Sequence, residues 1–117
     1  MLDNKKLEIF DFTGEGYDPT MSFGAWRVAF LNYAPRFDES NFNMIERHLE
    51  TDEVFVLLEG QATLVIGEAL ERVKMDAHKI YNVKAGVWHQ VLVSRDAKIL
   101  IVENDNTVKE NSEYRYF

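Results

Sequence analysis

The stretch IERHLETDEVFVLLEG, running from Ile45 to Gly60, contains two short segments of alternating character separated by a break at ETD. Side chains in a strand alternate between its two faces, so Glu46 and His48 are expected on one face, roughly 6.5 Å apart along the strand. Glu53 begins the second segment and shares a face with its apolar residues. A hairpin between the two segments would place Glu53 near His48, with both side chains facing the interior.

Similar short segments, apolar and rich in β-branched or aromatic residues, recur along the chain. Turn chemistry or a loss of apolar character separates them, for example at APRFDES, KAG and RDA. The pattern predicts strands at 25–33, 43–49, 54–59, 62–66, 79–83, 89–94 and 98–103. Residues 67–78, GEALERVKMDAH, fit either a helix of barely three turns or a strand. The first 24 residues, with glycines and a proline close together, are predicted to form an irregular arm.

The composition predicts one small domain spanning residues 1–117, because 117 residues leave little room for two. The formal net charge of −7 argues against a nucleic-acid partner, which needs a basic face. No apolar run approaches the roughly 20 residues that span a bilayer. The chain has no cysteine, and MLDNKKLEIF lacks the long apolar core of a secretory signal. We therefore expect a cytoplasmic protein with no membrane partner.

Polar residues stand at the starts or ends of several apolar segments. Glu46, His48 and Glu53 lie around the ETD break, and His89 opens HQVLV directly after the KAGVW turn. Such nitrogen and oxygen ligands suit one divalent Mn, Fe, Ni, Co or Zn ion. The alternative is that these side chains belong to the surface or to a hydrogen-bonded core, and we interpret His78 in this way.

The spacing within the quoted stretch resembles the first cupin motif. In that motif two histidines flank one residue, a glutamate follows after three or four residues, and a glycine follows after six more. Here Glu46 stands in place of the first histidine, and His48, Glu53 and Gly60 follow at matching intervals.

The second cupin motif is a proline-x-glycine turn that ends two residues before a histidine. The corresponding residues here are Lys84, Ala85 and Gly86, followed by His89, with lysine where proline is usual. The two resemblances together imply an all-β cupin fold, that is, a double-stranded β-helix or jelly-roll barrel with a site in its mouth.

Within cupins, ERH at 46–48 and GVWH at 86–89 resemble ureidoglycolate lyase, formerly called ureidoglycolate hydrolase. Asn82 matches the asparagine of that family's second turn. The chain departs from the family pattern at residues 83–85, where only Lys84 keeps a positive charge. Glu53 replaces the family's usual glutamine and restores the glutamate of metal-binding cupins, which favours a metal ion.

The resemblance implies cleavage of a small ureido or hydroxy acid to a glyoxylate-type product. His48 and His89 would act as acid and base, because their ordinary pKa lies close to working pH. Glu46 would orient an imidazole or act as the base itself. Lys84 would bind the carboxylate of an anionic substrate, with Asn82 and, at a lower rank, Tyr81 as further substrate-binding residues.

A second hypothesis is a metal-binding cupin, with Glu46, His48, Glu53 and His89 as ligands, that binds or isomerises a sugar acid or similar anion without lyase activity. A third is a stable barrel whose polar mouth performs no chemistry. The aromatic-rich segments LEIFDF and YRYF would be costly to leave exposed, so we expect a homodimer.

Overall fold

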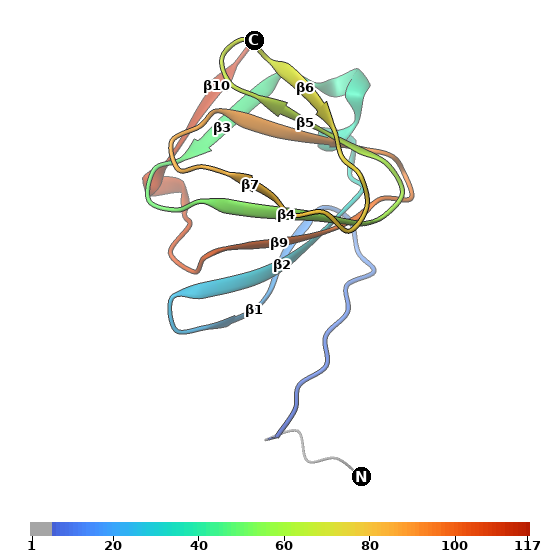
Figure 1. The fold of residues 1–117 in the computed structure, drawn as a ribbon, viewed down its shortest axis with the longest axis vertical. Coiled ribbons are helices and arrows are strands. Elements are labelled where there is room, and N and C mark those ends of the chain that lie inside the picture. The colour runs from blue at the N-terminus through green and yellow to red at the C-terminus, as the bar shows by residue number, and fades with distance from the viewer. Residues whose placement is uncertain (1–5) are drawn as a thin grey trace.

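The computed structural model describes residues 6–117, which form ten strands and three short 3-10 turns. Two five-stranded antiparallel sheets face each other and enclose the core (Figure 1). One sheet has the order β1-β2-β9-β4-β7 and the other the order β10-β3-β8-β5-β6. The strands are β1 Tyr17–Phe23, β2 Trp26–Asn32, β3 Met44–His48, β4 Glu53–Glu59, β5 Ala62–Ile66, β6 Glu71–Lys74, β7 Tyr81–Val83, β8 His89–Val93, β9 Lys98–Asn104 and β10 Ser112–Tyr116. The 3-10 turns are η1 Pro35–Phe37, η2 Glu39–Asn41 and η3 Lys109–Asn111.

Alternation along β4 and β9 builds the core between the sheets. In β4 the buried positions are every second residue, including Phe55 and Leu57, and in β9 they include Ile99 and Ile101. Burying an aliphatic or aromatic side chain of this size stabilises the fold by about 1.5–3 kcal/mol. The same alternation turns the polar residues at one end of each strand inward.

Gly60, the glycine of the first motif, directly follows β4 and lies in the left-handed region with φ of +74°. A Cβ atom at this position would lie 2.6 Å from the Cα atom of Ala97. Only glycine fits here without moving the backbone, so the motif glycine allows β4 to turn tightly into β5.

β3 and β4 do not form the hairpin considered above, because the two strands belong to opposite sheets. The segment between β3 and β4 is hydrogen-bonded to the last residue of β9 and to η3. The Leu49 N–H donates to the Asn111 carbonyl (2.9 Å), and the Thr51 hydroxyl accepts from the Asn104 N–H (3.1 Å). These bonds carry the chain across the barrel, so His48 and Glu53 meet face to face across the interior.

Three strands add to the predicted set. Part of the expected irregular arm is β1, and β10 near the C-terminus pairs with β3. In the segment 67–78, which fitted a helix or a strand, residues 71–74 form β6 against the edge of β5. The helix is disfavoured because Met75 is buried in the core and the pairing satisfies the backbone of β5.

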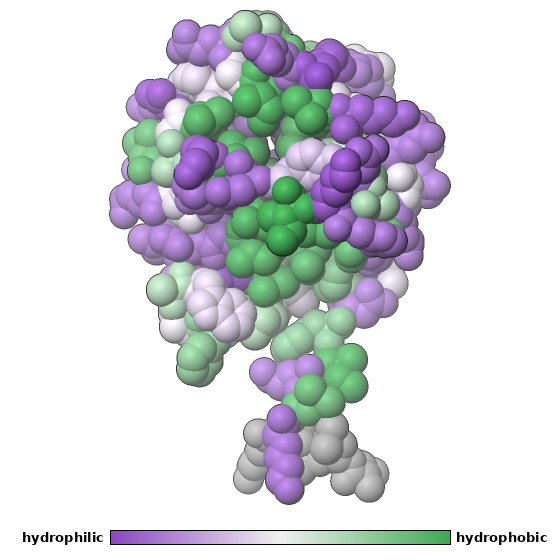
Figure 2. Space-filling model, in the orientation of Figure 1, coloured by the Kyte–Doolittle hydropathy of each residue, from purple (hydrophilic) through white to green (hydrophobic). Residues whose placement is uncertain are grey.

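The segment before β1 extends away from the barrel (Figure 1) and carries exposed apolar side chains (Figure 2). Leu7, Ile9 and Phe10 are 50%, 85% and 44% exposed. A homodimer that covers these residues stays a prediction. Within residues 6–117 no helix has the length and apolar character needed to cross a membrane.

Candidate functional site

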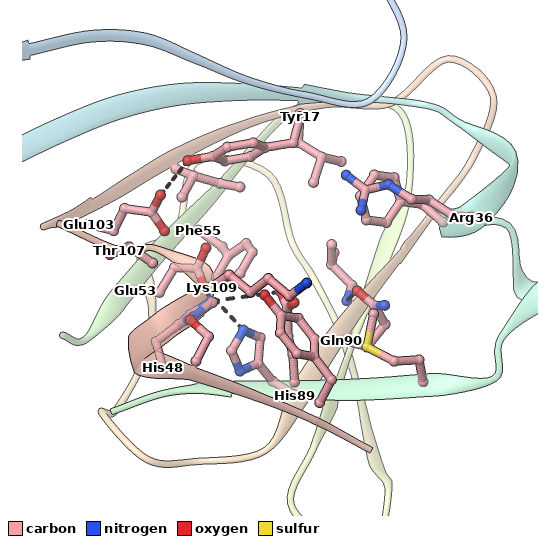
Figure 3. A pocket seen from close by; sticks show the side chains of 18 of the residues that line it. Tyr17, Arg36, His48, Glu53, Phe55, His89, Gln90, Glu103, Thr107 and Lys109 are labelled. Carbon is pink, nitrogen blue, oxygen red and sulfur yellow. Dashed lines mark hydrogen bonds and ion pairs between the residues drawn. The ribbon is translucent and has the colours of Figure 1, made fainter. Parts of the chain in front are cut away.

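A cavity of about 200 Å³ opens between the two sheets (Figure 3). Its wall combines apolar side chains with an unusual number of charged and polar ones. The lining residues are Tyr17, Arg27, Leu31, Arg36, Phe37, Met44, Glu46, His48, Glu53, Phe55, His89, Gln90, Val91, Ile101, Glu103, Thr107, Val108, Lys109, Ser112 and Tyr114.

The four residues predicted as metal ligands or catalytic groups meet in this cavity. Glu53 Oε1 lies 2.9 Å from His89 Nε2 and 3.2 Å from His48 Nε2. Glu46 Oε1 lies 3.7 Å from His48 Nε2, and Glu46 is directly opposite His89 in the pairing of β3 with β8. Three strands from two sheets therefore aim carboxylates and imidazoles at one point.

The other nitrogen of each imidazole is held by a hydrogen-bond acceptor. His89 Nδ1 is 3.0 Å from the Val87 carbonyl, which only accepts. His48 Nδ1 is 2.8 Å from Ser112 Oγ, whose own proton is donated to the Val108 carbonyl (2.9 Å). Both Nδ1 atoms must therefore carry a proton.

The proton on each Nδ1 atom determines how the Nε2 atoms can interact with Glu53. A neutral imidazole protonated at Nδ1 has a lone pair at Nε2, and that lone pair would face the Glu53 carboxylate. The contact is favourable only if each Nε2 also carries a proton or if a cation lies between the groups. Holding Nδ1–H on an acceptor is also the usual way in which proteins orient a histidine for metal binding at Nε2.

The pKa values follow the same geometry. Burial lowers the pKa of His48 and of His89, but the hydrogen bonds and charge of Glu53 raise both pKa values by more. Burial raises the pKa of the Glu46 carboxyl above its ordinary value, and the two histidines pull it back only in part. Burial also acts to raise the pKa of Glu53, yet its bonds to the histidines hold the pKa well below the ordinary value.

Two groups of side chains offer metal-ligand atoms within 4.8 Å of one another. One group is Glu46, His48 and His89, and the other is His48, Glu53 and Glu103. Two imidazoles with one or more carboxylates suit Fe, Mn, Co, Ni or Zn. The described residues therefore fit a divalent metal ion, which would be held by the two imidazoles together with carboxylates.

Sequence analysis missed a second polar unit beside this cluster. The Tyr17 hydroxyl donates to Glu103 Oε2, and Arg27 donates to the same oxygen from Nε at 3.2 Å. Burial and the charge of Glu53 raise the pKa of Glu103. An available signal was the inward position of Glu103 in the apolar alternation of β9, whereas nothing in the sequence places Tyr17 there.

The three predicted substrate-binding residues do not line the cavity. The Asn82 amide and the Ala85 N–H both donate to the Asp52 carboxylate, at 3.0 and 2.8 Å. Lys84 is exposed, and the Tyr81 hydroxyl accepts from the Asp76 N–H (2.8 Å). They belong to the edge strand β7 and the turn after it, and the bonds to Asp52 hold that turn in place.

No family model matches the chain, and no curated protein matches it by sequence. Solved structures do match. Streptomyces Pac13, described as a nucleoside dehydratase, has a TM-score of 0.67 over 91% of this chain and 83% of its own, at 12% identity. Variants of it have been solved with uridine. A cupin-2 domain protein from Shewanella frigidimarina has a TM-score of 0.57 over 86% of this chain and 90% of its own, at 20% identity.

The fold is that of a cupin. Another structure with a similar fold, Fe(II) HppE, has a TM-score of 0.59 at 12% identity and covers 76% of this chain, which spans half of HppE. At these identities the likeness concerns the fold of the cupin barrel. The fold prediction is confirmed, and the resemblance to ureidoglycolate lyase stays a prediction.

Proposed function

We propose that the chain is a small-molecule cupin enzyme of the lyase type that acts on a small ureido or hydroxy acid. The observation that carries this proposal is the convergence of His48 Nε2 and His89 Nε2 on Glu53, with both Nδ1 protons held by acceptors and Glu46 beside them. The cavity volume of about 200 Å³ is below the usual range for drug-sized ligands, which favours a small acid.

The proposed chemistry is the cleavage of a carbinolamide such as ureidoglycolate to glyoxylate and urea. A base takes the hydroxyl proton, the carbon–oxygen double bond forms, and the carbon–nitrogen bond breaks. The bonding electron pair stays on nitrogen, which takes a proton from an acid. Glu46 suits the base because burial raises its pKa, and His48 suits the acid because the net effect of its surroundings is to raise its pKa.

His89 has a supporting role in this scheme. It is 3% exposed, and its Nε2 atom is on Glu53, so it holds that carboxylate in position. A divalent metal ion held by Glu46, His48, Glu53 and His89 would supply Lewis-acid polarisation of a substrate oxygen. Phe55, Leu31 and Ile101 form an apolar part of the cavity wall.

The test is release of glyoxylate from ureidoglycolate, measured with chelator-treated protein and with protein supplied separately with each of the five divalent ions. Turnover that is lost in the His48→Gln variant is the expected result. Absence of turnover with ureidoglycolate and with other small ureido and hydroxy acids, under every metal condition, would overturn the lyase proposal.

The Glu53 carboxylate favours a second candidate, a metal-binding cupin that binds or isomerises a sugar acid or similar anion. Glu53 Oε1 is within 3.2 Å of both Nε2 atoms and completes a set of two imidazoles and two carboxylates. In this candidate Glu53→Gln abolishes metal uptake and ligand binding together. In the lyase, a glutamine amide oxygen still accepts from the imidazoles, and turnover persists.

A further inference from the structure

Arg36 is a positive group at the cavity with no partner within residues 6–117. It lies in η1, lines the cavity, and makes neither a hydrogen bond nor an ion pair with the described chain. Its guanidinium carbon lies 4.4 Å from the centre of the Phe37 ring, a cation–π contact that restricts its position. Figure 3 shows the guanidinium pointing from the rim into the cavity.

Gln90 adds a second donor on this side of the cavity. The side chain is 6% exposed, and its Oε1 accepts from the Val91 N–H at 3.0 Å. Because an N–H donor must face the amide oxygen, this bond fixes which end of the amide is Nε2. Across the described chain Nε2 makes no hydrogen bond, so a buried amide offers two unused protons beside the cavity.

Most of the charged residues labelled in Figure 3 lie on two sides of the cavity, and the Arg36 charge also acts to lower the pKa of Glu46. Glu103, Glu53 and His48 lie on one side in Figure 3, with Arg36 and Gln90 on the other. Arg27, the other arginine among the described lining residues, is already paired with Glu103. An anion entering the cavity is therefore repelled from the carboxylate side, and among residues 6–117 it meets unpaired donors at Arg36, Gln90 and the exposed Lys109 near the mouth.

From these contacts we propose that Arg36 and Gln90 form a carboxylate-binding subsite, which selects small monocarboxylic acids for the proposed lyase. The selection of lyase substrates rests on the proposed function, whereas the binding of a carboxylate by Arg36 and Gln90 does not depend on it. The planar guanidinium matches the two oxygens of a carboxylate, and the amide Nε2 adds a third bond. An acid held in this way presents its remaining substituents to Glu46 and His48. This assignment replaces the anchoring role predicted for Lys84.

The test uses metal-free, isotopically labelled full-length protein titrated with glycolate and, separately, with glycolamide, its neutral amide. Glycolate is expected to shift the NMR signals of the Gln90 side-chain amide and to bind at least about tenfold more tightly than glycolamide. Arg36→Gln should weaken glycolate binding by about tenfold or more while leaving glycolamide unchanged. Arg36→Lys should retain part of the affinity for glycolate, because lysine keeps the positive charge but lacks the paired N–H donors of the guanidinium.

Lys84→Gln and Lys74→Gln are the matched controls, since each removes one exposed positive charge outside the cavity. Both should bind glycolate within about twofold of the unaltered protein. The subsite is overturned if Arg36→Gln has no larger effect than these controls, if glycolamide binds as tightly as glycolate, or if the unaltered protein binds no glycolate. Because neither metal nor turnover enters the measurement, failure of the lyase assay and failure of the subsite are separate outcomes.

Discussion

Toward one end of β4 and β9 the inward side chains are Glu53 and Glu103, and toward the other end they are Leu57 and Ile99. All four are 5% exposed or less, so the two ends differ in chemistry and not in burial. The apolar end gains free energy from removing hydrocarbon from water. The charged end costs free energy, because each carboxylate loses its hydration and needs partners inside the barrel.

At the charged end, hydrogen-bond and ion-pair partners offset part of the free-energy cost of burying the carboxylates. Glu53 is bonded to the two histidines, and Glu103 to Tyr17 and Arg27. Replacing such a network by packed apolar residues is often neutral or stabilising, so folding alone gives little reason for it. Buried groups with shifted pKa values that surround a cavity are typical of functional sites. The core therefore has an apolar half that stabilises the barrel and a charged half that lines the candidate site.

The largest expected effect on stability is at the apolar end. Ile99 is 0% exposed, and Ile99→Ala removes buried methyl groups and leaves a void, so we expect a loss of about 2–5 kcal/mol in the free energy of unfolding. Urea unfolding measures this loss. Ile80→Ala is the control, because Ile80 is 74% exposed and should change stability by no more than about 0.5 kcal/mol. Equal effects of the two changes would contradict the division of the core.

At the charged end, the expected effect is on metal binding. Glu53→Gln removes the carboxylate that faces both Nε2 atoms, and we expect metal affinity to fall by at least about 10–100-fold. Isothermal titration with Mn, Fe, Co, Ni and Zn salts measures the change. Glu59→Gln is the matched control, because Glu59 is on the same strand but exposed. If both variants bind metal equally, Glu53 is not a ligand.

The central cluster was predictable because strand alternation and motif spacing both act over short distances. A hairpin was one way for His48 and Glu53 to meet, and in the structure they meet across the two sheets. The two residues meet even without a hairpin, because inward-facing positions on opposite strands converge in a narrow barrel. Tyr17 and Ser112 were missed, since pairing brings them to the site from strands far away in the sequence.

The predicted substrate-binding residues show that closeness to a motif histidine in sequence does not place a side chain in the cavity. Lys84 and Asn82 precede the motif histidine His89 by only a few residues, but they lie on the edge strand β7 or its turn, outside the cavity. Sequence proximity to His89 does not fix the direction of a side chain beyond the strand end. Arg36 reaches the cavity from η1, a segment that sequence analysis treated as a break between strands.

The charged end of the core also makes the stability of the protein depend on pH. Burial lowers the pKa values of His48 and His89, but Glu53 raises them by more, so both values in the folded protein stand above the ordinary 6.5. A raised folded pKa gives stability that is full below the unfolded pKa and is lost as pH rises through the folded value. Glu46, with its raised pKa, acts in the same direction. Glu53, with its lowered pKa, contributes stability that is full above its unfolded value of 4.5 and is lost as pH falls through the folded value.

Metal-free protein should therefore become less stable as pH rises from about 6 through the folded histidine pKa values. Urea unfolding at several pH values gives the slope. His48→Gln removes one of the two titrating imidazoles and should make the slope shallower, whereas Ile99→Ala should lower stability without changing the slope. A slope of the opposite sign would show that the Nε2 atoms are not protonated in the metal-free protein.

The smallest expected effect is at Tyr17, which supports the charged end without offering a ligand to either metal-binding group. Tyr17→Phe removes one hydrogen bond to a buried carboxylate, while Arg27 keeps Glu103 paired. We expect a loss of about 1.5 kcal/mol in unfolding free energy, at the lower end of the range for bonds to charged groups, with metal affinity unchanged. Tyr116→Phe is the control, because Tyr116 is 70% exposed. A large loss of metal affinity in Tyr17→Phe would instead mean that Glu103 moves when its hydroxyl partner is lost, and that the two polar units act as one site.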